Sequence, residues 1–146
     1  MIGLRVHFEL SPGLTTALGA FQSPRINKIF RESLLEGALE IQRVAAQEKI
    51  MRGGVKGRGK NKTISPPLPD KLTSRSGDLR RSIKVDRSEL PFAIEIGTEL
   101  VYGRAHELGY PPRNLPARPF LGPAVEDVAP KFETFFFNAV MRAVGL

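Results

Sequence analysis

The sequence contains no cysteine, and its 146 residues include only two histidines, His7 and His106. The absence of cysteine excludes disulfides and thiolate-ligated metal sites, and it fits a reducing compartment. No apolar run approaches the ~20 residues that a membrane-spanning helix needs. The longest apolar cluster is Phe135-Phe136-Phe137. We therefore expect a soluble, cytoplasmic protein that does not enter a membrane.

The N-terminal residues Met1 to Arg5 alternate in polarity and lack the basic region and apolar core of a signal peptide. The length predicts a single domain, residues 1–146, which can bury roughly 70% of the surface of its unfolded chain without metals or disulfides.

The net charge of +7 is concentrated in one segment. Residues 52–75 carry a charge of +6, from seven basic residues and one acid, Asp70, whereas the remaining fifteen basic and fourteen acidic residues give only +1. The basic residues are Arg52, Lys56, Arg58, Lys60, Lys62, Lys71 and Arg75. The chain therefore has one basic segment instead of a generally basic surface.

This segment coincides with a predicted Gly/Pro-rich loop at about residues 52–73, in which no periodicity is visible. A loop of about twenty residues in a compact domain is commonly functional or disordered. Gly54 to Asn61 approaches the phosphate-binding pattern G-x4-G-K-[ST], but Asn61 replaces the hydroxyl residue. We reject a P-loop because such a loop follows a strand and opens a helix, and this one follows a predicted helix and precedes prolines.

Regular patterns occupy the N-terminal third of the chain. Ile2 to Leu10 alternates apolar and polar residues, which predicts a half-buried strand with His7 on its exposed face. Ser11-Pro12 predicts a short helix to about Ala20, and Ser23-Pro24 opens the longest helix, to about Met51. The apolar stripe of this helix comprises Ile26, Phe30, Leu34, Gly37, Ile41, Val44 and Ala45. Leu35 and Leu39 lie off the stripe, so they either broaden the core face or contact a neighbouring copy.

The C-terminal half alternates short strands and helices. Ser76-Gly77-Asp78 predicts a helical turn that holds Leu79, and residues 83–87 and 92–96 predict an antiparallel hairpin. A helix from about Ala124 to Val144 follows, which Pro130 must kink or split. The order predicts an α+β fold: a mainly antiparallel sheet of about four strands, with the long helix packed across it and a C-terminal helix.

Between the hairpin and the last helix, Val101, Tyr102, Ala105 and Leu108 fall at helical spacing, and Gly109 stands where a C-terminal cap belongs. Pro116 to Leu121 then predicts a stiff, extended arm, because proline fixes its own φ and biases the residue before it toward extended geometry. We expect this arm to pair with the edge of the sheet, where prolines are tolerated.

His106-Glu107 is the only candidate for a catalytic or metal-binding pair. A zincin helix needs a second histidine four positions on, and Tyr110 stands there instead. We therefore expect no catalytic residue, no metal and no cofactor. The alternative is that His106 and Glu107 make hydrogen bonds that fix the short helix to the loop after it.

The pattern Y-x-x-x-H-E-x-G at Tyr102 to Gly109, followed by Pro-Ala-Arg-Pro-Phe-Leu-Gly, resembles the tail-completion (virion-morphogenesis) proteins of tailed bacteriophages. Residues 74–83 are similar to the family's TG-x-L-R-x-S-I segment, with Ser76 in place of threonine, and residues 94–98 are similar to its VGT strand. The matching residues are Gly77, Leu79, Arg80, Tyr102, His106, Glu107 and Gly109. In that family the His-Glu motif is a structural signature and not an active site.

The resemblance implies a structural virion protein without enzymatic activity, which completes the tail or joins head and tail at the neck. It implies a homo-oligomer, commonly a hexameric ring around the genomic DNA, that contacts other neck and tail proteins. Its implied location is the head–tail junction of a virion assembled in the host cytoplasm. The neighbouring roles of tail terminator and connector component remain alternatives.

Two sets of residues are candidates for these contacts. The basic residues Arg52, Lys56, Arg58, Lys60 and Lys62 would either face DNA phosphates without sequence preference or insert into a neighbouring component. Arg118, Phe120, Leu121, Leu35 and Leu39 are expected at a subunit or partner contact. A stand-alone nucleic-acid-binding protein is a weaker hypothesis, because the basic segment has no aromatic residue on which bases could stack.

Overall fold

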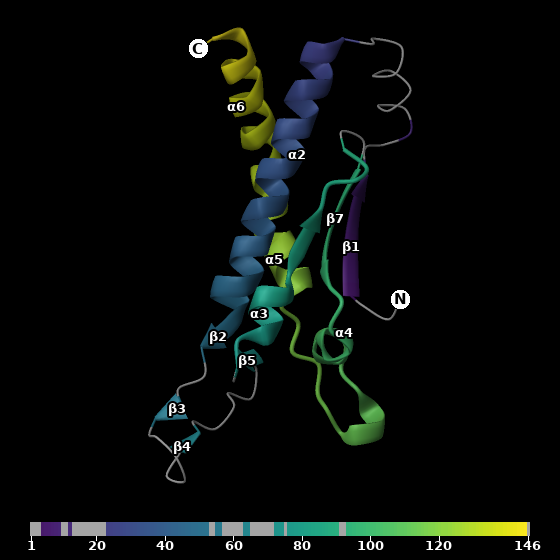
Figure 1. Ribbon diagram of the computed structural model, residues 1–146, viewed down its shortest axis with the longest axis vertical. Helices are drawn as coiled ribbons and strands as arrows, with labels where there is room; N and C mark the ends of the chain where they lie inside the picture. Colours follow the sequence, from purple (N-terminus) through teal and green to yellow (C-terminus); the bar gives the residue numbers. More distant parts are fainter. Residues whose placement is uncertain are drawn as a thin grey trace.

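The computed structural model describes residues 4–9, 12, 23–52, 55–56, 63–64, 72–74, 76–90 and 93–145. Its fold is α+β, as the sequence predicts, with a three-stranded antiparallel sheet crossed on one face by the long helix α2 (Pro24–Val44) (Figure 1). The strand order is β1 (Leu4–Glu9), β7 (Ala93–Thr98) and β6 (Lys84–Asp86), with β7 in the centre.

The pairing register gives the sheet one apolar and one polar face. Val6 lies opposite Ile96, and Ile96 lies opposite Val85 on the other side. These side chains belong to the core beneath α2. The next pairs along the strands are polar, and the exposed His7 lies opposite Glu95. The predicted strand, hairpin and exposed histidine are therefore confirmed.

Helix α2 starts at Pro24, whose missing N–H would have no partner in the first turn. It continues into a π-helix, Ala45–Lys49, which ends close to the predicted boundary. The long side chains of two residues join it to the hairpin region: Arg80 Nε donates to the Ala46 carbonyl at 2.5 Å, and Gln42 Nε2 donates to the Ile83 carbonyl at 2.6 Å.

The two leucines of α2 that lie off its apolar stripe differ in exposure. Leu35 is half-buried and packs against the core, so it broadens the core face, and its predicted role in a partner contact stays a prediction. Leu39 stays 40% exposed and remains available for a contact.

Pro130 splits the C-terminal helical region into α5 (Leu121–Val128) and α6 (Phe132–Val144), joined by a 3₁₀ turn at Ala129–Lys131. Helix α6 lies beside the upper half of α2 (Figure 1). Gly37 permits this close approach, because a Cβ atom there would overlap the Phe132 ring. Arg142 Nη2 binds Glu36 at 2.8 Å across the same pair of helices.

The segment predicted as an aperiodic loop at about 52–73 contains short paired strands. β2 (Ile50–Arg52) pairs parallel with β5 (Leu72–Ser74), and β3 (Val55–Lys56) pairs antiparallel with β4 (Thr63–Ile64). Strands of two or three residues are too short to produce a visible alternation. They lie apart from the main sheet, at the end of the molecule opposite the C-terminus (Figure 1).

Two further expectations have different outcomes. The predicted short helix up to Ala20 lies, apart from Pro12, outside the described residues. The proline-containing arm does not add a fourth strand: residues 116–119 have no strand assignment. Two of its prolines offer no N–H to a ladder, and the chain turns into α5 at Phe120.

Candidate interaction surface

The motif residues meet at the end of β7, where α3 (Asp78–Ser82) and α4 (Val101–Leu108) pack together. The buried Thr98 links them: its hydroxyl lies 2.6 Å from Ser82 Oγ and accepts the Leu100 amide at 3.2 Å. Gly103 makes the contact possible, since a Cβ atom there would lie 2.5 Å from the Thr98 methyl group and 3.3 Å from Leu79. One part of each segment that carries the resemblance therefore lies in a single packing cluster, which we call the motif cluster: Leu79, Ser82, Thr98, Gly103 and the rest of α4.

Glu107 joins this cluster to the start of α5. Its two carboxylate oxygens accept the backbone amides of Phe120, Leu121 and Gly122 at 2.8, 3.0 and 2.7 Å. The first amides of a helix have no acceptor within the helix, and the positive end of the helix dipole favours a carboxylate there. The predicted role of Glu107, hydrogen bonding to the chain that follows α4, is confirmed.

His106 contributes through its backbone and its ring rather than through a side-chain hydrogen bond. Its carbonyl accepts the Arg118 amide at 2.7 Å, and its ring stands edge-on to Tyr102, with 6.2 Å between centroids. Its Nδ1 atom is buried, and no group in the described part of the chain forms a hydrogen bond with it. Burial lowers the pKa of His106 below its usual range, and the nearby Arg118 charge lowers it further. The imidazole is therefore mainly neutral at pH 7.

The structure corrects two predicted contact residues. Phe120 and Leu121 have 0% and 1% of their surface exposed and belong to the core, so neither can serve as an anchor for a partner. Glu107 fixes their amides at the start of α5, and their side chains then turn inward. Arg118, half-buried between two exposed neighbours, is the only member of the arm's three candidates that reaches the surface.

The outer side of α4 and the turn after it form an open, mainly apolar pocket of about 820 Å³, which we call the α4 groove. Its lining comprises Val101, Tyr102, Arg104, Ala105, Leu108, Gly109, Tyr110, Arg113 and Leu115. Val101 and Leu108 are 65% and 63% exposed. The sequence analysis did not predict this surface. The signal was present, because a helix of two turns with four apolar positions cannot bury all four side chains on one narrow face.

The geometry of the turn keeps the groove open. Gly109 has φ +78°, a conformation that favours glycine, and it reverses the chain after α4. Tyr110 and Leu115 then close the turn through two backbone bonds, from Tyr110 N to the Leu115 carbonyl at 2.8 Å and from Leu115 N to the Tyr110 carbonyl at 3.2 Å. Their side chains lie on the groove as a consequence.

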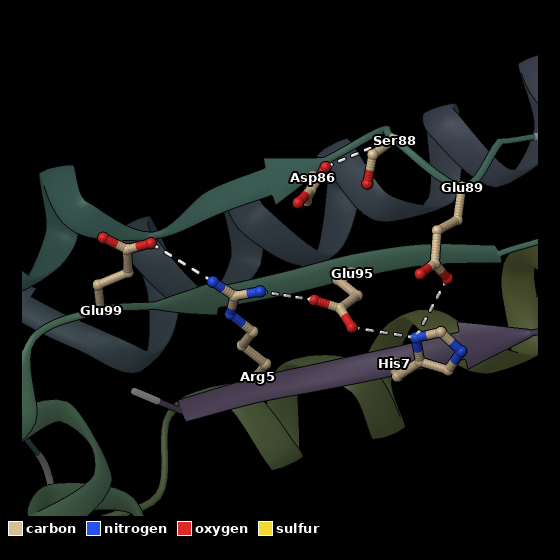
Figure 2. A network of polar contacts seen from close by, with 7 residues as sticks. All are labelled: Arg5, His7, Asp86, Ser88, Glu89, Glu95 and Glu99. Carbon is tan, nitrogen blue, oxygen red and sulfur yellow. Dashed lines mark hydrogen bonds and ion pairs between the residues drawn. The ribbon is translucent and has the colours of Figure 1, made fainter. Parts of the chain in front are cut away.

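The polar face of the sheet carries a network of charged side chains (Figure 2). Arg5 Nη1 lies 3.0 Å from Glu95, and His7 Nδ1 lies 3.3 Å from the other oxygen of the same carboxylate. Arg5 also reaches Glu99 at 3.4 Å. A hollow of about 370 Å³ lies over this face. Because groups of both signs pair with each other there, we assign it no ligand.

The basic segment is described only in part. The backbone of Arg52 belongs to β2 and that of Lys56 to β3. Arg58, Lys60 and Lys62 lie outside the described residues, in the connection between β3 and β4.

The chain is thus an α+β protein in which one helix crosses a small antiparallel sheet and a hydrogen-bonded cluster supports an exposed apolar groove. Comparison with protein-family models, curated proteins and solved structures found no match. Among the described residues, no helix is long and apolar enough to span a membrane. No group of three or more metal-ligating side chains comes together within the same residues.

Proposed function

We propose that this chain is a structural virion protein of a tailed phage, which completes the tail or joins head and tail at the neck as a subunit of a ring around the DNA. The observation that carries the proposal is the use of Glu107. Both of its oxygens accept hydrogen bonds from backbone amides. The His106-Glu107 pair, the only candidate for a catalytic pair in the sequence, therefore holds α4 against the start of α5. This use agrees with the structural role that the family resemblance implies for the motif.

The exposed groove and the basic segment both suit an assembly component. An apolar surface of this kind on a small protein favours a protein contact. In a ring, the basic segment would repeat its charge of +6 once per subunit and attract DNA phosphates without sequence preference. Tail-terminator and connector rings have the same physical requirements, and they are the alternative roles.

Electron microscopy of a lysate from phage with a nonsense mutation in this gene tests the proposal. We expect DNA-filled heads beside separate, full-length tails. Abnormally long or missing tails would assign the protein to length termination or tube assembly instead. Intact, infectious particles would contradict a role in the virion.

A second experiment addresses the basic segment. Replacing Arg52, Lys56, Arg58, Lys60 and Lys62 with serine should impair joining while the far-ultraviolet spectrum and the unfolding midpoint stay unchanged. Serine at the exposed Arg87, outside the segment, provides the control. Unchanged infectivity of the five-serine phage would rule out a role for the basic segment in joining.

A stand-alone nucleic-acid-binding function is the second candidate, and the same +6 segment favours it. Binding through phosphate contacts weakens linearly on a log–log plot against salt concentration. Salt-dependent binding of DNA by the isolated monomer at moderate ionic strength would favour this function. Binding that appears only in the assembled ring would favour the neck protein.

A further inference from the structure

Helix α6 carries an apolar ridge on the side that faces away from α2. Phe137, Val140 and Val144 follow one another at spacings of three and four residues, so they share one face of the helix. Phe137 and Val144 are 60% and 63% exposed, whereas Ala139, on the α2 side, is fully buried. An α-helix that is apolar on both sides is normally covered on both sides. The α6 ridge, Phe137, Val140 and Val144, is therefore a surface that no other element in the described part of the chain covers.

The same chain offers a second apolar surface, which carries charges of the opposite sign. The α4 groove is concave and apolar, and it carries two exposed cations, Arg104 and Arg113. The α6 ridge is convex, and the exposed Glu133 continues it one turn before Phe137. Apolar side chains three, four and seven residues apart are the anchors with which an amphipathic helix binds a groove. The ridge supplies three such anchors and one carboxylate for the two arginines.

The two surfaces cannot meet within one molecule. Helix α6 runs along the upper half of α2, and α4 lies beyond the other end of the sheet (Figure 1). We propose that the α6 ridge of one copy docks in the α4 groove of the next copy. Each copy then offers a ridge on one side and a groove on the other. Such a head-to-tail contact continues from copy to copy and closes into a ring if the rotation allows it. The proposal rests on the ring-forming function above and names the surfaces that meet.

The absence of native cysteine allows a direct test by disulfide cross-linking. Leu108→Cys places a thiol in the groove, and Phe137→Cys places one on the ridge; both positions are exposed, so the fold should tolerate them. We expect a covalent dimer when the two purified variants are mixed and oxidised, and monomers when either is oxidised alone. Arg87→Cys mixed with Phe137→Cys is the matched control, since Arg87 is exposed on the hairpin turn.

Charge reversal sharpens the test. Glu133→Arg in the ridge variant should lower the cross-link yield roughly tenfold, because like charges then face each other across the contact. Arg104→Glu together with Arg113→Glu in the groove variant should restore the yield. Cross-linking that ignores the sign of these charges would overturn the assignment of Glu133 to the groove.

Two other results would overturn the contact itself. One is equal dimer formation by Phe137→Cys alone, which indicates a symmetric ridge-to-ridge contact. The other is a mixed yield no higher than that of the Arg87 control. If cross-linking fails while the nonsense phage still accumulates unjoined heads and tails, the contact is wrong and the neck function stands. If cross-linking succeeds while such phage are intact, the contact stands and the neck function is wrong.

Discussion

The carboxylates of Glu107 and Glu95 each accept from several donors. Glu107 lies in the partly buried contact between α4 and α5, whereas Glu95 lies on the exposed face of the sheet. Glu107 binds three backbone amides that the start of α5 already holds in place. Glu95 binds the side chains of Arg5 and His7 on the solvent-facing side of the sheet (Figure 2). Fixed amides lose little freedom on binding, whereas the exposed side chains of Arg5 and His7 lose rotamer freedom and their charges are screened by salt. Similar contact distances therefore correspond to different contributions to stability.

The largest effect is expected at Glu107. Glu107→Ala should lower the free energy of unfolding by about 2–4 kcal/mol, because it leaves partly buried amides without an acceptor and removes the anion from the start of α5. Urea denaturation followed by circular dichroism measures the change. Glu107→Gln keeps one acceptor and should lose less. Glu126→Ala, at an exposed position of α5, is the control. Equal losses of unfolding free energy at Glu107 and Glu126 would mean that the amide contacts of Glu107 contribute no more than an exposed glutamate does.

Gly103 tests whether the motif cluster is as tightly packed as its distances indicate. Gly103→Ala should cost about 1–3 kcal/mol, because the added methyl group must displace Thr98 or α4. The comparison is with Arg104→Ala, the next position of the helix, which is exposed and should stay within about 0.5 kcal/mol of the wild type. Thermal or urea unfolding of both variants measures the two free-energy changes. A Gly103→Ala variant as stable as the wild type would mean that the motif cluster is loosely packed.

His106 adds a pH dependence to the motif cluster. Its pKa is lowered in the folded state by burial and by Arg118, so the unfolded chain binds the proton more readily. The stability associated with neutral His106 is present above the unfolded pKa of about 6.5 and is lost as the pH falls through the folded value. His106→Gln should flatten this decline below pH 6.5. The pKa values of Glu40, Asp78 and Asp86 are also lowered. Their contribution to the stability of the protein is lost in a more acidic range, and this loss should be the same in the wild type and in His106→Gln.

The smallest effect is expected on the polar sheet face. Arg5→Ala should change the free energy of unfolding by no more than about 1 kcal/mol, and the change should shrink in high salt, as for other exposed ion pairs. Parallel urea titrations at low and high salt measure both quantities. A salt-independent loss as large as that of Glu107→Ala would show that the network on the sheet supports the fold after all.

The sequence was informative wherever a local rule operates over enough residues. The alternation of β1, the stripe of α2, the cap at Gly109 and the break at Pro130 each follow from the preferences of consecutive residues, and each prediction was confirmed. Strands of two or three residues, such as β3 and β4, are too short for any periodic signal. The partner role predicted for Phe120 failed for another reason: its amide binds a carboxylate thirteen residues away and its side chain lies in the core, and no local pattern reveals either contact.

The sequence by itself determined the α+β class, the order of the main elements, the absence of disulfides and the single basic segment, because composition and local periodicity fix these properties. Only the tertiary structure decided what the motif residues do. Whether Glu107 binds amides, a metal or nothing depends on which groups the fold brings within 3 Å of its oxygens. In the same way, the face of α6 that stays exposed is decided by the packing of the opposite face on α2, which a pattern of apolar residues on both faces does not reveal.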